Sequence, residues 1–231
     1  MRQCLTVVVP CFNEESTISQ LLDRVLEQKS VREVIVIDDA STDNSFAIIT
    51  LKRDSRINLV SNSQNMGKGA SVRKAFEIAT SEYILIQDAD LEYSPEEYDR
   101  LLKPLIDGYA DAVFGSRFLT YETRRVGNFW HTMGNRFLTS ISNALSNIYL
   151  TDMETCYKVI KLEFAQKLKI RESRFGIEPE ITAKLAKLGA RIYEVPISYH
   201  GRTYQEGKKI TWKDGFSAIR CVLKYNLQRV S

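Results

Sequence analysis

Two carboxylates spaced two residues apart, Asp88 and Asp90, are the residues of this chain best placed to do chemistry. They follow residues 83–86, an apolar run that predicts a buried strand. On extended chain, residues i and i+2 point to the same side, so both carboxylates can reach one cation. Mg²⁺ and Mn²⁺ prefer oxygen ligands and are often completed by substrate phosphates. The spacing therefore predicts a metal–diphosphate site beyond the carboxyl end of a parallel strand. The alternative is a pair of solvated loop aspartates.

Composition narrows the class of protein. The chain has 231 residues, of which 44% are hydrophobic, which is enough for one sizeable core. A net charge of +3 does not indicate a nucleic-acid-binding protein. The four cysteines lack metal-type spacing and are typical of reduced thiols in a cytosolic protein. We find neither a signal peptide nor an apolar run of the ~20 residues that cross a bilayer. We therefore expect a soluble, cytoplasmic protein, at most peripheral on the cytoplasmic membrane face.

Strand and helix patterns alternate over the first 115 residues. Apolar runs at 5–9 and 34–37 predict strands, and residues 18–26 between them have the apolar period of a helix. This is the βαβ unit that a parallel pair of strands requires. Further along, Ser94 and Glu97 predict a helix start, as N-cap and capping-box residues around a proline. We expect an α/β fold with a mostly parallel sheet that is flanked by helices on both faces.

The pattern changes in the second half of the chain. Residues 118–131 and 200–210 combine low periodicity with glycines and cations, and we expect mobile loops that close over the ligands. Further elements are expected here: helices at 135–148, 178–188 and 212–228, and a strand at 192–196. Because no linker interrupts the chain, we expect residues 1–231 to form a single domain.

The final predicted helix, residues 212–228, is amphipathic. Its apolar residues share one face: Trp212, Phe216, Ile219, Val222, Leu223 and Leu227. Basic residues are interspersed: Lys213, Arg220, Lys224 and Arg229. A basic amphipathic helix can lie in the membrane interface. The alternative is that the apolar face packs on the protein's own core or on a dimer partner.

Six short motifs follow one another along this framework. They are Val9-Pro10-Cys11-Phe12-Asn13-Glu14-Glu15, Ile37-Asp38-Asp39-Ala40-Ser41-Thr42-Asp43, Asn65-Met66-Gly67-Lys68-Gly69, Asp88-Ala89-Asp90-Leu91-Glu92, Gly115-Ser116-Arg117 and Thr151-Asp152. In this order the chain resembles the family 2 inverting glycosyltransferases. It is most similar to their dolichyl-phosphate mannose synthase branch, which transfers sugar to a polyprenyl phosphate. Phe12 stands where the family has tyrosine, and Ala40 where it has glycine.

The resemblance implies a GT-A-type, Rossmann-like fold in which residues 1–115 bind a GDP- or UDP-linked sugar. The donor-binding candidates are Pro10, Phe12, Glu14, Asp39, Lys68, Asp88, Arg202 and Lys208. Mg²⁺ or Mn²⁺ would be held by Asp88 and Asp90, with Glu92 as a third ligand or as a helix-entry charge. Other roles remain open: Glu14 as a charge at a helix start, Phe12 as a core residue, and the glycines around Lys68 as a simple turn. For Arg202 and Lys208, and likewise for Arg136, the alternative is a solvated surface charge.

Residues 116–231 are expected to bind the acceptor. The resemblance makes Arg117 and Arg136 candidates for an acceptor phosphate, which a guanidinium binds in bidentate geometry. It places Asp152 beside the acceptor, as a catalytic base or as a group that orients a cation or caps a helix. The implied acceptor is a polyprenyl phosphate at a membrane surface.

Two other functions stay open. One is transfer to a hydroxyl of a polysaccharide, protein or small molecule, and the other is a nucleotide-sugar-binding subunit without turnover. Relatives in this branch often carry membrane helices after the catalytic domain, which we do not find in this sequence. A homodimer and a membrane-anchored partner are both compatible with the chain.

Overall fold

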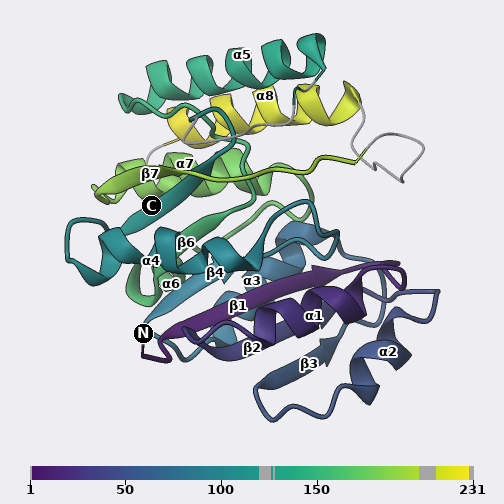
Figure 1. Ribbon diagram of the computed structural model, residues 1–231. Coiled ribbons are helices and arrows are strands. Elements are labelled where there is room, and N and C mark those ends of the chain that lie inside the picture. The colour runs from purple at the N-terminus through teal and green to yellow at the C-terminus, as the bar shows by residue number, and fades with distance from the viewer. Residues whose placement is uncertain (1, 120–125, 127, 203–211, 229–231) are drawn as a thin grey trace.

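One seven-stranded sheet forms the centre of the protein, in the order β3-β2-β1-β4-β6-β5-β7 (Figure 1). The computed structural model describes residues 2–119, 126, 128–202 and 212–228, the first three of the last range by backbone only. The strands are β1 (Leu5–Cys11), β2 (Val31–Asp38), β3 (Ile57–Ser61), β4 (Tyr83–Ile86), β5 (Ala112–Ser116), β6 (Lys158–Lys161) and β7 (Ile192–Pro196). The predicted mostly parallel sheet is confirmed, since only β6 runs antiparallel, to β4 and β5.

Strand direction decides which loops can form a site together. Strand β6 lies between β4 and β5 and is antiparallel to both. As a result, β5 runs in the same direction as β1, β2 and β4. The residues after these four strands therefore meet at one edge of the sheet, where ligands of open α/β sheets bind. Asp39, Asp88 and Arg117 each lie directly beyond one of these strand ends.

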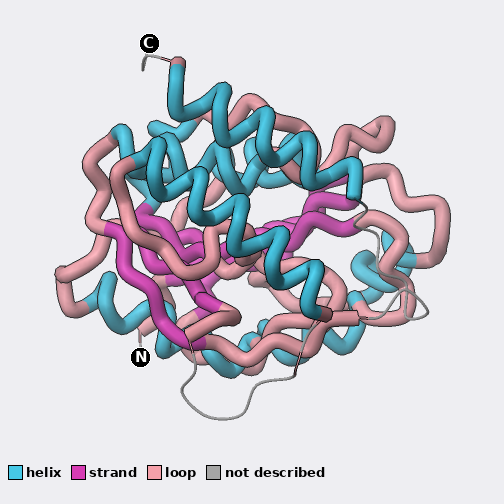
Figure 2. The backbone as a smooth tube through the Cα atoms, turned by 90° about the horizontal axis from the view of Figure 1, so that it is seen from above, coloured by secondary structure: helices cyan, strands magenta, loops and turns pink. Residues whose placement is uncertain are grey.

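Helices cover both faces of the sheet. One layer contains α1 (Ile18–Leu26), α2 (Ser45–Leu51), the 3₁₀ turn η1 (Pro95–Glu97) and α4 (Tyr98–Ile106). The other contains α3 (Lys68–Ile78), α6 (Leu162–Leu168) and α7 (Ile177–Lys187). Two longer helices, α5 (Phe129–Ser146) and α8 (Trp212–Leu227), lie side by side over α7 as an outer layer (Figures 1 and 2).

The core follows from the apolar runs of the strands. Every side chain of β4 and nearly all of β1 are buried, as expected for strands covered on both faces. Helix α1 buries Ile18, Leu21, Leu22 and Val25, one face at helical spacing. A single apolar cluster joins the strands with α1, α3, α4 and α7. This continuous core fixes the positions of the strand ends that form the site.

Several predicted elements need correction. Helix α5 begins at Phe129, not at residue 135, because the Asn128 side chain caps it by accepting from the backbone N–H groups of Trp130 and His131. The predicted mobile loop at 118–131 is therefore wrong over its last three residues. Residues 120–125, 127 and 203–211 lie outside the described residues, and with them the test of both loops and of Lys208.

The predicted capping box at Ser94 is also wrong. The Ser94 side chain caps nothing, and the Glu97 carboxylate instead accepts from the backbone N–H and hydroxyl of Ser198. Strand β6 and helix α6 were not predicted, since each is short. Among the helices of the described ranges, none is long and apolar enough to cross a membrane.

The predicted apolar face of the last helix divides in two. Val222 is buried, together with Ala218, Cys221 and Tyr225, whereas Phe216, Leu223 and Leu227 are exposed. Residues 212–214 have no described side chains and Arg229 lies beyond the described range, so Trp212 and Lys213 are not placed on either face. The helix thus packs on α7 and still presents apolar side chains outward.

Candidate active site

The loop after β2 contains Asp39, a predicted donor-binding residue. The Asp39 carboxylate is almost fully buried and accepts from Asn62 Nδ2 at 2.8 Å and from the backbone N–H groups of Met66 at 2.9 Å and Gly67 at 2.7 Å. Both of its oxygens therefore hold the segment that leads into α3. A nucleotide contact by Asp39 remains a proposal.

The segment after β1 supplies the other nucleotide candidates. Pro10 and Phe12 are half-buried, so Phe12 is not a full core residue. Glu14 is buried, its backbone N–H donates to Ser45 Oγ, and its carboxylate accepts from Arg202 at 3.3 Å. The structure thus brings Glu14 and Arg202, which are far apart in the sequence, to one place.

Asp88 and Asp90 lie beyond β4 at the centre of the sheet edge. Gln87, which is fully buried, accepts from the hydroxyls of Tyr98 at 2.7 Å and Tyr157 at 2.6 Å and donates to the Asp88 carbonyl at 2.9 Å. This network fixes the backbone that carries the two aspartates. Sequence reasoning missed Gln87, although a polar residue directly after a buried apolar strand was the available signal.

Each aspartate is paired with a cation of the protein. Asp88 Oδ1 lies 2.8 Å from Lys68 Nζ, and Asp90 Oδ2 lies 3.1 Å from Arg202 Nη2. Glu92 accepts from the Tyr199 hydroxyl and from the backbone N–H of Arg202, both at 2.7 Å. Within the described ranges no three His, Cys, Asp or Glu side chains form a metal-holding group. In this conformation Glu92 therefore holds the 199–202 segment and does not complete a three-carboxylate cluster.

The electrostatics of the two aspartates differ. Burial, together with the nearby charges of Asp88 and Glu92, raises the pKa of Asp90 to about 7. Burial also acts to raise the pKa of Asp88, but the ammonium of Lys68 outweighs it and the pKa is lowered. Both side chains keep some exposure, 26% and 19%. Two accessible carboxylates with only oxygen donors fit a hard divalent cation whose remaining ligands are phosphate or water oxygens.

The start of α3 is closely covered by the segment before α7. A Cβ on Gly67 would lie 2.3 Å from the Ser173 carbonyl oxygen, and one on Gly69 would lie 2.2 Å from that of Glu172. The Ala70 backbone N–H donates to the Ser173 carbonyl at 3.2 Å. The glycines beside Lys68 thus allow two backbones to touch, and the Ala70 N–H is already used within the protein.

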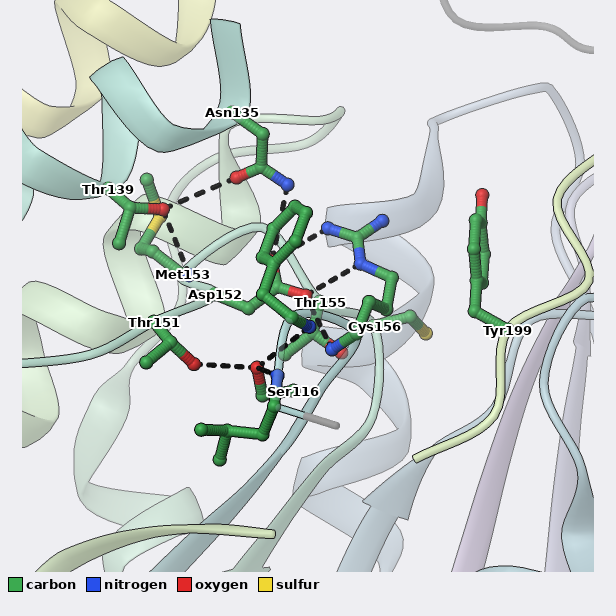
Figure 3. A network of polar contacts seen from close by, with 12 residues as sticks. Ser116, Asn135, Thr139, Thr151, Asp152, Met153, Thr155, Cys156 and Tyr199 are labelled. Atoms are coloured by element: carbon green, nitrogen blue, oxygen red, sulfur yellow. Dashed lines mark hydrogen bonds and ion pairs between the residues drawn. The ribbon is translucent and has the colours of Figure 1, made fainter. Parts of the chain in front are cut away.

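Arg117, directly beyond β5, forms a buried ion pair with Asp152. Figure 3 shows the polar network around Asp152. Arg117 Nε and Nη2 donate to the two Asp152 oxygens at 2.7 Å each, and the Arg117 backbone N–H donates at 3.0 Å. Asn135 Nδ2 from α5 adds a fourth contact at 3.2 Å. Asp152 is fully buried, and the Arg117 side chain is 12% exposed. Every oxygen of Asp152 is therefore engaged.

The remaining donors of Arg117 are available for a ligand. A guanidinium has five N–H groups, Asp152 takes two, and the other three have no hydrogen-bond partner among the described residues. The Tyr199 ring stands 5.1 Å from Arg117 Cζ, and the Phe118 ring lies within 6 Å of both Arg117 Cζ and Arg136 Cζ. The structure thus groups the two predicted phosphate-binding arginines around one aromatic ring.

Glu194 on β7 holds the Asp152 segment in place. Its carboxylate accepts from the backbone N–H groups of Thr151 at 2.9 Å and Asp152 at 3.2 Å. Burial raises the pKa of Glu194, while these hydrogen bonds act to lower it. Sequence reasoning missed Asn135 and Glu194, because each reaches Asp152 only through the folded sheet.

Comparison with known proteins agrees with this geometry. Residues 6–168 match the family model described as Glycosyl transferase family 2, and the chain belongs to that family. It is a glycosyltransferase. An uncharacterized protein of Methanocaldococcus jannaschii is 32% identical over 222 residues, which cover 89% of this chain and 94% of that protein.

Two further relatives have named activities. The undecaprenyl-phosphate 4-deoxy-4-formamido-L-arabinose transferase of Aeromonas hydrophila is 26% identical, over 88% of this chain and 62% of its own. The polyprenol monophosphomannose synthase of Mycolicibacterium smegmatis is 24% identical, over 85% of this chain and 77% of its own.

Among solved structures, glucosyl-3-phosphoglycerate synthase from Mycobacterium tuberculosis is similar with a TM-score of 0.73 and 20% identity, over 99% of this chain and 82% of that one. That crystal structure contains Mn²⁺, UDP and glucosyl-3-phosphoglycerate. At this identity the likeness concerns the fold, and the predicted GT-A-like fold is confirmed.

Proposed function

We propose that this protein is a metal-dependent inverting glycosyltransferase of the dolichyl-phosphate mannose synthase type. It would move a sugar from a GDP- or UDP-linked donor to a polyprenyl phosphate. One observation carries the proposal: Arg117 is fixed by Asp152, keeps three unpaired N–H donors within the described structure, and shares a sheet edge with Asp88 and Asp90. The two relatives with named activities differ in sugar, yet both names contain a polyprenyl carrier.

The donor would bind where the ends of β1, β2 and β4 meet. Pro10, Phe12, Glu14 and Asp39 border the nucleoside region, and Lys68 and Arg202 are the described cations nearest to Asp88 and Asp90. Mg²⁺ or Mn²⁺ held by the two aspartates would neutralise charge on the leaving diphosphate. When a diphosphate binds, Lys68 and Arg202 can exchange their carboxylate partners for phosphate oxygens.

The chemistry at the acceptor follows from its charge. A phosphate oxygen is already ionised at neutral pH and can form the bond to the anomeric carbon without a base. The bond from that carbon to the diphosphate breaks on the opposite face, and its electron pair leaves with the nucleoside diphosphate, so the configuration inverts. A hydroxyl acceptor would need a carboxylate to take its proton, which is typically worth ~10²–10⁴-fold in rate. Because Arg117 and Asn135 occupy both Asp152 oxygens, Asp152 is better suited to orient Arg117 than to accept a proton.

A lipid acceptor requires a surface that meets the membrane, and α5 offers one. The helix buries polar residues, Asn135, Thr139 and Ser142, and exposes apolar ones, the reverse of an ordinary surface helix. The exposed large apolar residues of α5 and the adjoining α8 are Phe129, Trp130, Met133, Phe137, Leu145, Phe216, Leu223 and Leu227. Residues 129–146 and 215–227 include no Asp or Glu and carry Arg136, Arg220 and Lys224, of which the last two also pair with Glu172. An apolar, basic face suits an anionic lipid surface.

Calorimetric titration with GDP and UDP, in Mn²⁺ or in chelator, tests the donor site. We expect one diphosphate to bind with a clear gain in affinity from Mn²⁺, and Asp90→Asn to remove most of that gain. As a control, Asp54→Asn changes a carboxylate far from the site that pairs with Arg56, and this variant should bind as the parent does. Equal diphosphate affinity with and without Mn²⁺ in the parent protein would rule out the metal role.

A further inference from the structure

Lys68 lies between two carboxylates, only one of which belongs to the proposed metal site. Its Nζ is 2.8 Å from Asp88 Oδ1 and 3.1 Å from Glu178 Oε1. Glu178 is in the first turn of α7 and is buried, with a side-chain exposure of 7%. Nothing in the donor or acceptor chemistry above uses this glutamate.

A buried lysine holds Glu178 in place. Glu178 Oε2 accepts from Lys158 Nζ at 2.6 Å, and the Lys158 side chain on β6 is fully buried. The other oxygen, Glu178 Oε1, is buried and accepts no hydrogen bond within the described structure. Lys68 is the cation that lies beside this oxygen. The result is a row of alternating charges, Lys158, Glu178, Lys68 and Asp88, contributed by four different elements.

The backbone contacts at Gly67 and Gly69 make this row possible. They let residues 172–173 touch the start of α3, which sets the first turn of α7 beside Lys68. A surface ion pair would not require this close packing. Burying charged groups such as Lys158 and Glu178 is costly unless each is compensated. The arrangement is therefore specified by the fold around Lys68.

We propose that Glu178 is a positioning residue that sets how strongly Lys68 competes with a divalent cation for Asp88. This inference rests on the proposed function, in which Asp88 binds the metal. When a cation arrives at Asp88, Lys68 must give up that carboxylate. Glu178 is already beside the Lys68 ammonium as a second carboxylate partner. When Lys68 releases Asp88 to the cation, its ammonium is therefore not left unpaired.

Removing the Glu178 charge has opposite effects on two binding events. Without it, Asp88 becomes the sole carboxylate partner of Lys68 in the described structure, so a metal ion must displace a stronger competitor and binds less well. A diphosphate in the absence of metal meets a Lys68 that is no longer neutralised, so it binds equally well or better. A general loss of structure would weaken both events, which separates positioning from a structural role.

The test compares Lys158→Met with the double variant Lys158→Met/Glu178→Gln. The single variant keeps the pair of Glu178 with Lys68, and the double variant loses it without leaving Lys158 buried and unpaired. Replacing a buried ion pair by neutral groups of similar size is often tolerated. Thermal unfolding checks that both variants are folded, and calorimetry measures the affinity for the nucleoside diphosphate that the parent binds, in Mn²⁺ and in chelator.

We expect the gain in affinity from Mn²⁺ to fall about tenfold in the double variant relative to Lys158→Met, which is ~1.4 kcal/mol. Affinity in chelator should not fall. In a Lys158→Met/Lys68→Met background the Glu178→Gln change should have no effect on the Mn²⁺ gain, since the glutamate acts through Lys68. An equal Mn²⁺ gain in the two Lys158→Met variants would overturn the role of Glu178 and leave the donor site intact. No Mn²⁺ gain in the parent protein would overturn both.

Discussion

Replacing Asp152 by asparagine removes the charge that holds Arg117. The variant keeps the shape and one acceptor oxygen of the side chain, but its amide group faces a guanidinium that has only donors. Arg117 then has no carboxylate partner in the described structure, and water cannot fully replace it because the Arg117 side chain is only 12% exposed. We expect a loss of both stability and transfer, because the guanidinium is no longer oriented toward the acceptor.

The size of the stability loss follows from burial. At 2.7 Å and an effective dielectric constant of about 20, the attraction between the charges is ~6 kcal/mol before desolvation is counted. Removing one partner of a buried pair costs about 3–5 kcal/mol, because the other charge is left uncompensated. The remaining acceptor oxygen favours the lower end, so we expect the free energy of unfolding to fall by about 3 kcal/mol.

Asp54 provides a matched control. Its carboxylate accepts from the backbone N–H, Nε and Nη2 of Arg56, the same three contacts that Asp152 receives from Arg117. Its side chain is 29% exposed, and for such pairs we expect Asp54→Asn to cost no more than about 1 kcal/mol. Urea unfolding at pH 7 measures both variants. If Asp152→Asn lost no more stability than Asp54→Asn, the buried carboxylate of Asp152 would not be what holds Arg117 in place.

Three other sets of variants test the packing around the glycines, the ion pairs of Glu172 and the exposed face of α5. Gly69→Ala should destabilise the protein by about 1–3 kcal/mol or more, because the new Cβ would lie 2.2 Å from a backbone oxygen. Gly134→Ala should instead stabilise it by about 0.5–1 kcal/mol, because this Cβ lies in mid-helix and meets no atom within 4 Å. Thermal unfolding measures both variants. Burial acts to raise the pKa of Glu172, but hydrogen bonds from Lys224, Tyr225 and Arg220 lower it to about 2. The folded pKa is thus below the unfolded one, so the stability from Glu172 is present above about pH 4.5 and is lost as pH falls toward 2; acid unfolding should be less steep over this window in Glu172→Gln, and an unchanged slope would contradict it. Finally, the parent protein should sediment with anionic liposomes at low salt and Phe137→Glu should not, whereas Leu51→Glu should behave as the parent, since Leu51 lies on the distant α2 and is even more exposed than Phe137, 77% against 59%. Sedimentation of all three alike would exclude the α5 face.

Local patterns were enough to predict much of the sheet and the place of the site. β1, β2 and β4 contain apolar runs because these strands are covered on both faces, and the carboxylates two and four residues after β4 mark the carboxyl ends of the parallel strands. Helix α5 was harder, because its buried face is polar and its exposed face is apolar. Its start at Phe129, after the cap residue Asn128, was therefore not recognised from the apolar period.

The partners of the site residues could not be predicted from local sequence. Glu178 reaches Lys68 because Gly67 and Gly69 let the backbone of residues 172–173 pack closely on α3. Glu194 reaches Asp152 from β7, the outermost strand of the sheet. Both contacts join segments far apart in the chain. The order of the strands, with an antiparallel β6 between β4 and β5, brings them together and leaves no periodic signal.

The proposed acceptor is a phosphate that Arg117 binds. The most direct measurement supplies one short-chain polyprenyl lipid in two forms, as the phosphate and as the free alcohol, with Mn²⁺ and a panel of GDP- and UDP-linked sugars. We expect sugar transfer to the phosphate, with inversion at the anomeric carbon, and none to the alcohol. Transfer to the alcohol at an equal or greater rate, or turnover only with soluble hydroxyl acceptors, would contradict the account.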